Sequence, residues 1–460
     1  MSDSDTSSAS ASLTGRILNA LGLHRRELRA WAMYDWALSA QETTIAVALF
    51  PIFFLQFAAA DLPDGVGPQL IAYGNSVSIL LVALLSPVLG AIADFAAVKK
   101  RMLAVFMAGG ALAAAAMFLI ERGDYFLAMV LFVLASVGAQ GSRVFYESLL
   151  PRIAREGEVD RVSTAGYAMG YVGGGLLLAL NLAWIQRPEW FGLPSGPDLT
   201  PAEGSLPARL AFLSVAVWWV LFSIPLFRRV PEPDVALEAD ESAGMNPVRV
   251  GFTRLVETFR EIRAYKQAFL MLLAFLIYND GISTIQKMAT TYGTEIGLAD
   301  TDMIPAILIV QFVGIPFTFL FGLLAVRLGA KRSIFVGLAV FMTVSILGYN
   351  LRTATHFYAL ALLVGLAQGG TQALSRSLFA TMIPKHKSGE FFGFYSVFSR
   401  FAAVFGPVVF AAVYGASGSS RNAILSIIGF FIVGGVLLAF VDVEKGKRQA
   451  QQVEAALTVV

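Results

Sequence analysis

Residues 69–101 read QLIAYGNSVSILLVALLSPVLGAIADFAAVKKR. The run from 69 to 93 is predominantly apolar, and three consecutive basic residues follow at 99–101. A helix of about 20 apolar residues is long enough to cross the hydrocarbon core of a bilayer. Lys and Arg gather in the short loops on the cytoplasmic side of a membrane. This stretch therefore predicts one transmembrane helix that ends in a short cytoplasmic turn.

The rest of the chain repeats this pattern. Its 460 residues are 57% hydrophobic and only 14% charged, with a mean hydropathy of +0.68, which indicates a membrane protein and excludes an ordinary soluble enzyme. The apolar stretches are too long and too continuous for the strands of a barrel. We predict an all-α integral membrane protein with twelve transmembrane helices, at 31–58, 69–93, 102–120, 125–149, 163–186, 208–227, 267–292, 303–326, 332–351, 356–381, 389–415 and 421–441.

Several kinds of chemistry are excluded by what the sequence lacks. It has no Cys, so disulfides, thiolate metal sites and iron–sulfur clusters cannot form. The three His residues lie at or beyond the ends of the apolar stretches, which leaves an intramembrane haem without paired ligands. The net charge of +2 is too small to indicate a nucleic-acid binder. We expect no metal, no cofactor, no nucleic acid and no enzymatic activity.

The basic residues predict how the chain is oriented. If the N-terminus is cytoplasmic, 25 of the 34 Lys and Arg residues fall on cytoplasmic segments and only 5 on the opposite side. We therefore expect both termini in the cytoplasm, most simply at a bacterial inner membrane. The longest connection splits the chain into halves of six helices each. The predicted segments are a cytoplasmic tail with an amphipathic helix (1–30), a first bundle (31–227), a linker with an interfacial helix (228–266), a second bundle (267–441) and a cytoplasmic tail (442–460).

The two halves share spacings of unusual residues, as expected of transporters built from repeats. The shared spacings are Gly90 to Lys99 with Gly322 to Lys331, Arg143 to Pro151 with Arg376 to Pro384, and Asp35, Gln41 and Glu42 with Asp280, Gln286 and Lys287. The register of the last match is open, because depth in the bilayer places Glu42 rather than Asp35 level with Asp280. The pattern predicts a pair of six-helix pseudo-repeats.

The turn after residue 89 carries a recognisable motif. The run Gly90, Asp94, Lys99, Lys100, Arg101 resembles the signature between the second and third helices of the major facilitator superfamily, with Ala97 where that family usually has Gly. The resemblance implies the major facilitator fold. It also implies that Asp94 takes part in the conformational change of a transporter.

A narrower resemblance extends over five of the predicted helices. It is carried by Trp31-Ala-Met-Tyr-Asp-Trp-Ala-Leu-Ser-Ala40, Val144-Phe-Tyr-Glu-Ser-Leu-Leu-Pro151, Gly166-Tyr-Ala-Met-Gly-Tyr-Val-Gly-Gly-Gly175, Tyr278-Asn-Asp-Gly281, and Gly370-Thr-Gln-Ala-Leu-Ser-Arg376 with Glu390-Phe-Phe-Gly-Phe-Tyr395. Together these resemble the autophagy-related vacuolar amino-acid effluxers and their bacterial relatives. Leu38 and Glu147 stand where that branch usually has Asn.

Ionisable residues inside the apolar stretches are the candidate functional groups, because each is costly to hold in lipid. Asp35, Ser39 and Glu42 share one face of the first helix at i, i+4 and i+7. Acidic and basic groups at separate depths suit a zwitterion. The candidates for substrate binding or coupling are Asp35, Ser39, Glu42, Tyr278, Asn279, Asp280, Gln286, Lys287, Tyr395 and Arg400.

Two roles are open for Glu42. A carboxyl group in a central cavity can carry a coupling proton. Alternatively, Glu42 forms a permanent ion pair with Lys287 or Arg400 that only fixes helix packing. Lys287 lies near the end of its helix, where its ammonium group can also extend to the surface.

Four further charged residues lie near the cytoplasmic ends of their helices: Asp94, Arg143, Glu147 and Arg376. We expect them to form a gate, with Glu147 pairing with Arg143 one helical turn away and Asp94 accepting a second bond. The alternative is that both Arg side chains extend to the surface.

These features favour a secondary active transporter that moves a small polar metabolite by alternating access, with a proton as a candidate coupling ion. The resemblance implies an amino acid as substrate. An exporter of amphipathic compounds and a non-transporting sensor on a transporter fold are the alternatives. The expected partners are the substrate, protons and the lipid bilayer; no protein partner is implied.

Overall fold

The computed structural model describes residues 13–63, 66–155, 157–234, 236–237, 245–260, 265–295, 298, 300–401, 405–455 and 458–459. The tail predicted at 1–12 lies outside these residues. Nearly all of the described chain is helical, which confirms the predicted all-helical membrane fold. Two strands of two residues each, β1 and β2, pair antiparallel, with Ala236 opposite Val459.

Within the described residues, eleven helices are long and apolar enough to span a membrane. The helices correspond to the predicted stretches and mostly extend beyond them by several residues. They are α2 with its continuation (Arg26–Ala58), α4 (Val66–Ala96), α5 with η3 (Lys99–Leu119), α6 (Tyr125–Ile153), α7 (Val159–Gln186), α8 (Pro201–Arg229), α10 (Lys266–Glu295), α11 (Asp300–Leu328), α12 (Ala330–Tyr349), α13 (Ala354–Thr381), and α16 (Ser420–Ser426) with α17 (Ile428–Ala439).

Two helices are described within the predicted span 389–415, one on each side of residues 402–404, which lie outside the described residues. These are α14 (Ser388–Phe401) and α15 (Phe405–Ser417). The remaining helices are α1 (Leu13–Ala20), α9 (Pro247–Arg260) and α18 (Val443–Ala455), with the 3₁₀ turns η4 (Pro188–Phe191) and η5 (Lys385–Lys387). The short α3 (Phe50–Phe53) is part of the first spanning helix.

One amphipathic helix was predicted within residues 1–30, but the described part of this segment contains α1 and the start of a second helix, α2. The chain leaves the helical conformation at Gly22, whose φ of +71° is left-handed. A Cβ at Gly22 would lie 2.8 Å from the Cβ of Arg161. This close approach requires glycine, so α1 ends before it and α2 starts at Arg26.

The first spanning helix changes its geometry near its middle. From Gln41 to Leu49 the backbone is a π-helix, η1, and a second π segment, η2, covers Phe54–Ala58. Such segments are rare and often occur at functional sites, because the wider turn changes the direction of the side chains that follow. Glu42 and Thr43 lie in η1.

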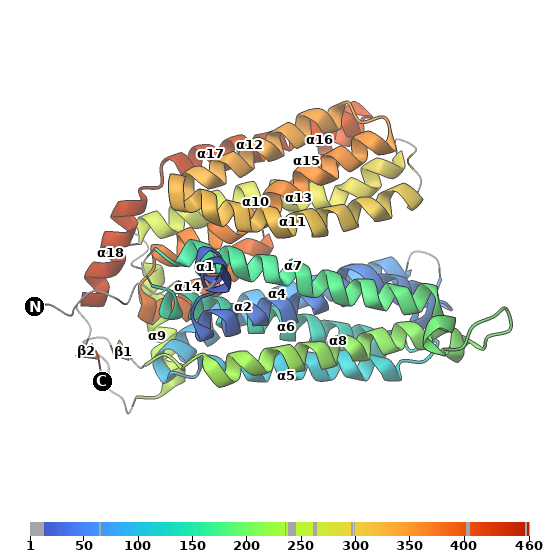
Figure 1. The fold of residues 1–460 in the computed structure, drawn as a ribbon, viewed down its shortest axis with the longest axis horizontal. Helices are drawn as coiled ribbons and strands as arrows, with labels where there is room; N and C mark the ends of the chain where they lie inside the picture. Colours follow the sequence, from blue (N-terminus) through green and yellow to red (C-terminus); the bar gives the residue numbers. More distant parts are fainter. Residues whose placement is uncertain are drawn as a thin grey trace, which may run out of the picture.

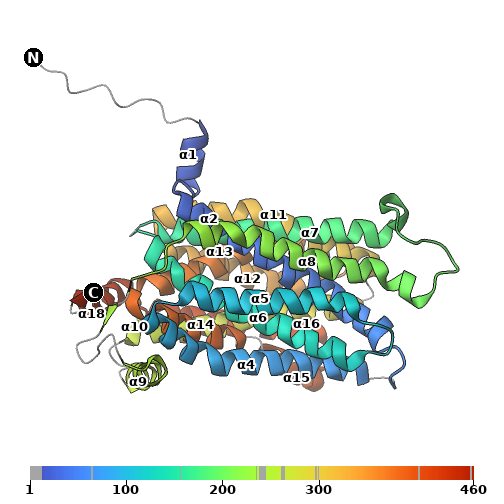
Figure 2. The same cartoon turned by 90° about the horizontal axis from the view of Figure 1, so that it is seen from below.

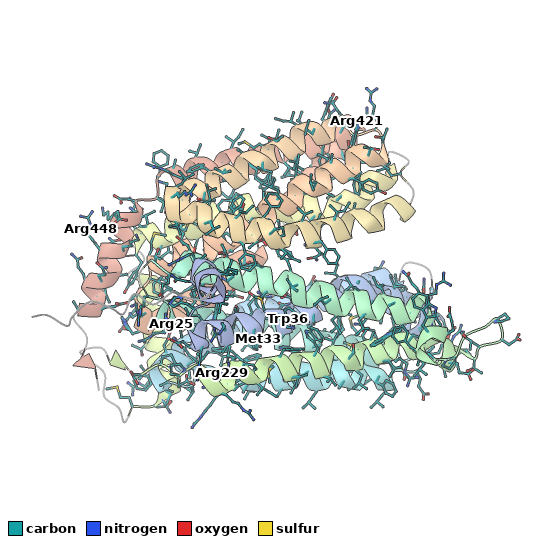
Figure 3. The ribbon with its side chains drawn as sticks, in the orientation of Figure 1. Arg25, Met33, Trp36, Arg229, Arg421 and Arg448 are labelled. Atoms are coloured by element: carbon teal, nitrogen blue, oxygen red, sulfur yellow. The ribbon has the colours of Figure 1, made fainter. Side chains whose placement is uncertain are left out.

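Figure 1 shows two groups of helices, with α10 to α13 and α15 to α17 in one and α2 and α4 to α8 in the other. Helix α14 lies against the second group, next to α4 and α6. The groups diverge toward the end opposite the chain termini. Helices α9 and α18 lie at the end with the termini, and α1 stands away from the bundle (Figure 2). Arg25, Arg229 and Arg448 lie at the same end, whereas Arg421 lies at the other (Figure 3).

Very close backbone contacts join α4 to α14 at the end with the termini. A Cβ at Gly90 would lie 2.2 Å from the carbonyl oxygen of Gly389, and a Cβ at Gly393 would lie 2.6 Å from the Cα of Pro87. Side chains larger than hydrogen cannot be placed here without separating the helices. These small residues close this end of the bundle.

Candidate functional site

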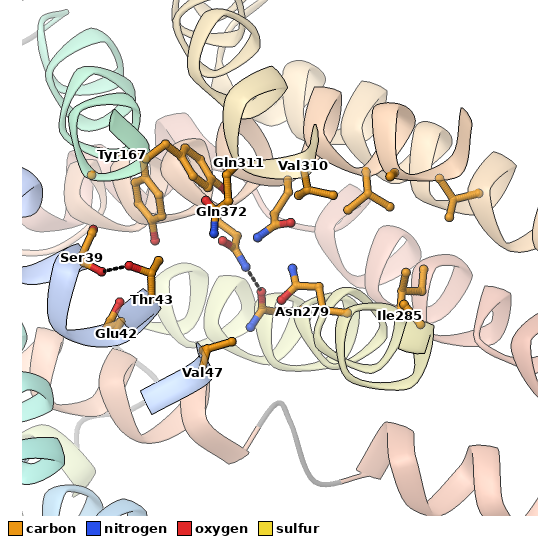
Figure 4. A pocket seen from close by; sticks show the side chains of 18 of the residues that line it. Ser39, Glu42, Thr43, Val47, Tyr167, Asn279, Ile285, Val310, Gln311 and Gln372 are labelled. Atoms are coloured by element: carbon orange, nitrogen blue, oxygen red, sulfur yellow. Dashed lines mark hydrogen bonds between the residues drawn. The ribbon is translucent and has the colours of Figure 1, made fainter. Parts of the chain in front are cut away.

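A cavity of about 660 Å³ lies between the two groups of helices. Residues of α2, η1, α6 and α7 line one side of it, and residues of α10, α11, α13 and α14 line the other. The volume is in the range of small-molecule binding sites. Figure 4 shows Glu42, Ser39 and Tyr167 at one end of this cavity, amides in the middle and Ile285 at the far end.

The charged end of the cavity is organised by Arg143. Its guanidinium donates from Nε to Oε1 of Glu42 at 3.2 Å and from Nη2 to Oε2 at 2.7 Å. This two-point contact fixes both planar groups. The Glu42 side chain is still 40% exposed, and it faces the cavity.

Asp35 lies deeper and contacts both Arg residues. Its Oδ1 is 3.8 Å from Nη1 of Arg143, and its Oδ2 is 3.5 Å from Nη1 of Arg376. The Tyr146 hydroxyl donates to Oδ2 at 3.2 Å, and the Ser39 hydroxyl lies 3.4 Å from Oδ1. These contacts fix the Asp35 carboxyl group between the two Arg side chains.

Arg376 is fully buried and reaches from α13 into the other group of helices. It donates from Nε to the Ser163 hydroxyl and from Nη2 to the Ser163 carbonyl, both at 2.9 Å. Its Nη1 lies 3.6 Å from Oε1 of Glu147. The guanidinium also lies over the rings of Trp31 and Tyr167, at 5.1 and 4.4 Å from their centroids, which are cation–π contacts.

Two glycines of α7 make room for this charged cluster. A Cβ at Gly166 would lie 3.2 Å from Nη2 of Arg376, and a Cβ at Gly170 would lie 2.6 Å from the Ser39 hydroxyl. Both positions therefore bring α7 close to α2.

Uncharged polar groups line the middle of the cavity. The Gln372 amide donates to the Asn279 side-chain oxygen at 3.2 Å. The side-chain oxygens of Gln311 and Gln368 and the hydroxyl of Tyr395 are buried and form no hydrogen bond within the described chain. Such groups are costly unless water or a ligand satisfies them. They are available to hydrogen-bond a bound molecule.

The far end of the cavity is apolar. It is lined from α10, α11, α12 and α13 by side chains that include Ile285, Val310, Val344, Phe357, Leu360 and Val364. This part is called the aliphatic recess below. The cavity therefore has a charged end, an amide middle and a hydrocarbon end.

The structure brings eight of the predicted site residues to the cavity wall. These are Asp35, Ser39, Glu42, Arg143, Glu147, Asn279, Gln286 and Tyr395. Tyr278, Asp280, Lys287, Asp94 and Arg376 are not among the lining residues. The side chain of Arg400 lies outside the described residues.

Asp280 and Tyr278 have contacts that explain their positions. Asp280 is 1% exposed, and its Oδ1 accepts a hydrogen bond from the Gly406 backbone N–H at the start of α15. The Tyr278 hydroxyl and that of Ser375 share a hydrogen bond of 2.5 Å. Both side chains join helices within one group.

The predicted gate residues pair differently from the expectation. Asp94 Oδ1 lies 2.5 Å from the Lys99 ammonium, and its Oδ2 accepts from the Glu390 backbone N–H at 2.9 Å. Lys99 also donates to the Ser388 hydroxyl at 2.7 Å. The prediction that Asp94 bonds to Arg143 was wrong, because Arg143 extends toward Glu42. Glu42 pairs with Arg143, whereas Lys287 and Arg400 were the partners predicted for it.

Sequence reasoning missed most of the uncharged cavity residues. These include Thr43, Tyr167, Tyr171, Gln311, Gln368, Gln372, Ser396 and Ser399. A usable signal was present, because three Gln residues in otherwise apolar stretches are unfavourable on a lipid-facing surface.

The described chain resembles known transporters in fold. It superposes with a TM-score of 0.66 on FucP, a major facilitator transporter in its outward conformation, at 14% identity over 92% of this chain and 99% of that one. The proton:xylose symporter XylE gives a TM-score of 0.68 at 13% identity, over 94% of this chain and 98% of that one. These similarities establish the major facilitator fold.

Sequence comparison establishes the family. Residues 69–160 and 157–451 match the family described as "Vacuole effluxer Atg22 like". The chain is 33% identical to the uncharacterized MFS-type transporter YxiO of Bacillus subtilis, over 93% of this chain and 97% of that protein. It is 24% identical to autophagy-related protein 22 of Kluyveromyces lactis, over 83% of this chain and 81% of that one. The chain belongs to the Atg22-like family of the major facilitator superfamily.

Proposed function

We propose that this secondary transporter moves a small polar metabolite by alternating access, with proton coupling. The observation that carries the proposal is the cavity between the two groups of helices, which has charged and amide groups in its wall and is closed at one end by helix contacts. Family membership supports a transporter of the major facilitator type. The other elements rest on the geometry of this cavity.

Closure of one end supports alternating access. At the end with the termini, Gly90 packs on Gly389, and the Ser163 hydroxyl donates to the Ala373 carbonyl at 2.7 Å. The groups of helices diverge at the other end (Figure 1). If the halves 31–227 and 267–441 rotate as two bodies, separation of these contacts opens the closed end. The distribution of basic residues supports a cytoplasmic position for that end, and we therefore propose that the structure corresponds to an outward-open state.

Glu42 is the proposed coupling group. It faces the cavity, it is partly exposed, and it pairs with Arg143. Protonation of Glu42 would release Arg143, which would then interact more strongly with Asp35. A proton at Glu42 thereby changes the contacts beside the closed end. This connection supports proton coupling.

An amino acid is one candidate, because the carboxylates of the cavity suit its ammonium group and the amides suit its carboxylate. The aliphatic recess favours a second candidate, which is export of an amphipathic compound. The lining of this recess is mainly aliphatic. With either substrate the protein is a multi-pass membrane carrier. We propose that it lies in the bacterial inner membrane with both termini in the cytoplasm.

Uptake into proteoliposomes tests the proposal. The full chain is reconstituted and supplied with labelled amino acids, sugars, carboxylates and amines, with and without an imposed pH gradient. We expect accumulation of at least one class of polar compound that depends on the gradient. Equilibration of no compound under either condition would contradict the transport proposal.

A further inference from the structure

The charged end of the cavity holds more negative than positive charge. Asp35, Glu42 and Glu147 are carboxylates, and Arg143 and Arg376 are the cations beside them. With all five ionised, the cluster carries a formal charge of −1. A net charge in a low-dielectric site is costly, so a proton or a bound cation is needed to balance it.

The two Arg residues have little capacity left for a substrate carboxylate. Arg143 already binds both oxygens of Glu42, and Arg376 binds Ser163 with two of its nitrogens. Arg376 is also fully buried and is not among the lining residues. Among the described lining side chains, Arg143 is the cation, and its strongest donors are occupied.

Glu42, in contrast, retains the capacity to bind a cation. A carboxylate has about four lone-pair sites, and Arg143 occupies two of those of Glu42. Its exposed surface faces the cavity, and Glu147 lines the same end. The rings of Tyr171 and Tyr395 also line the wall, and aromatic faces attract organic ammonium groups.

The rest of the cavity specifies the remainder of such a ligand. The amides of Asn279, Gln311 and Gln372 suit hydroxyl, carbonyl or amide groups, and the aliphatic recess suits a hydrocarbon end. No described side chain in the recess is charged. The order of environments is therefore cation site, neutral polar site and hydrocarbon site.

We propose that the substrate is an organic ammonium compound with a hydrocarbon end, and that its ammonium group exchanges with a proton at the Glu42 and Glu147 cluster. This rests on the proposed transport function and names its substrate class. In the exchange, the cluster releases one proton as it accepts one ammonium group, so its charge balance is unchanged. The excess negative charge of the cluster can be neutralised by the ammonium group or by the proton, but not by both at once. The two are therefore carried in opposite directions, and the carrier is an antiporter.

The groups that face the cluster come from five elements. Asp35 and Ser39 lie on α2, Arg143 and Tyr146 on α6, Tyr167 on α7, Arg376 on α13, and Tyr395 on α14. Arg and Tyr side chains keep their protonation between pH 5 and 8. A pH effect in that range is therefore assigned to the carboxylates.

The test uses three probes of the same shape with different charges. Binding of 2-phenylethylamine, phenylalanine and 3-phenylpropionate to the purified full chain is measured by calorimetry at pH 5 to 8, in buffers of different ionisation enthalpy. We expect the amine to bind most tightly, with release of about one proton per amine at the acidic end. Its Kd rises about tenfold for each pH unit below the carboxyl pKa. Tighter binding of the anion or the zwitterion, or an amine Kd independent of pH, would overturn the proposal.

Variants separate the cluster from general effects. Glu42→Gln removes the excess charge, so amine affinity falls at least tenfold and proton release disappears. Glu189→Gln is the matched control, because Glu189 is exposed and pairs only at the surface with Arg187. We expect Glu189→Gln to keep the amine affinity and the proton release of the parent. A Glu42→Gln protein that retains parental amine affinity and proton release contradicts the inference.

Proteoliposomes distinguish this inference from the transport proposal. If the amine binds with release of a proton but no probe crosses the membrane, the transport proposal is contradicted and the ammonium site is supported. Gradient-driven accumulation of phenylalanine without amine binding would contradict the ammonium site while transport stands.

Discussion

Arg376 and Ser163 join the two groups of helices through two hydrogen bonds of 2.9 Å, one to the hydroxyl and one to the backbone carbonyl of Ser163. The same guanidinium lies 3.5 Å from Asp35, which contacts Arg143 in turn. One buried residue thus connects the closed end of the bundle to the charged end of the cavity. Opening of the closed end requires that these two hydrogen bonds break.

Arg376→Ala is therefore expected to favour opening of the closed end. The chain has no native Cys, so a single Ser399→Cys substitution supplies a label site at the cavity wall. We expect maleimide labelling from the outward side to slow several-fold in Arg376→Ala, because the outward-open state becomes less populated. Ser163→Ala removes only the hydroxyl contact and should produce a smaller effect. Equal labelling of all three proteins would show that Arg376 has no gating role.

Asp94 and Lys99 form a buried ion pair beside the contact between α4 and α14. Removal of one partner leaves the other charge buried, which typically costs about 3 to 5 kcal/mol. Asp94→Asn should therefore lower the thermal unfolding temperature strongly. The Asp94→Asn, Lys99→Met double variant should recover much of this loss, because neither charge remains. If the loss of stability in the double variant equals the sum of the losses in Asp94→Asn and Lys99→Met, the pairwise explanation is ruled out.

Ala97 has a φ of +49°, the one left-handed non-glycine residue in the described chain. This conformation costs an L-residue about 1 to 2 kcal/mol, and glycine avoids that cost. Ala97→Gly should raise stability by about 1 kcal/mol or less, because glycine also loses more entropy on folding. Ala83→Gly, inside α4, is the control and should be destabilising by a similar amount. A less stable Ala97→Gly protein would contradict the strain argument.

Glu158 gives a pH-dependent contribution to stability. Partial burial opposes its ionisation, but hydrogen bonds from the Arg155 backbone N–H and from the Arg25 guanidinium outweigh this and lower the pKa of Glu158. The Arg25 to Glu158 contact measures 2.5 Å. A lowered pKa stabilises the folded state above the ordinary carboxyl pKa, and the effect is lost as the pH falls through the folded pKa.

Glu158→Gln should therefore reduce stability near pH 7 and have little effect below about pH 4. Chemical unfolding of both proteins across this range checks the expectation. A stability difference that is the same at pH 7 and pH 4 would be inconsistent with it.

The spanning helices were predictable because long apolar runs have one stable form in lipid, and the basic turns mark their ends. The rotation of each helix about its own axis could not be predicted. Asp280 was assigned to the cavity by its depth, but depth does not determine direction, and it faces α15. The π geometry of η1 also changes the direction of Glu42, and no sequence pattern indicated this segment.

The charged cluster was predicted only in part. Asp35, Glu42 and Arg143 were recognised because each is costly in lipid. Their pairing could not be predicted, because Arg376 approaches from the other half of the chain, more than 200 residues away. The uncharged amides of the cavity gave a weaker signal, since Gln is less costly in a membrane than a charge.

The central claim is that Glu42 couples substrate movement to a proton. It is tested most directly by accumulation of a transported compound in proteoliposomes under an imposed pH gradient, compared between the parent and Glu42→Gln. Glu42→Asp serves as the control that keeps the carboxylate. We predict that the parent accumulates the compound, that Glu42→Asp retains part of this activity, and that Glu42→Gln accumulates none. Accumulation by Glu42→Gln with the same dependence on the pH gradient as the parent would contradict the claim.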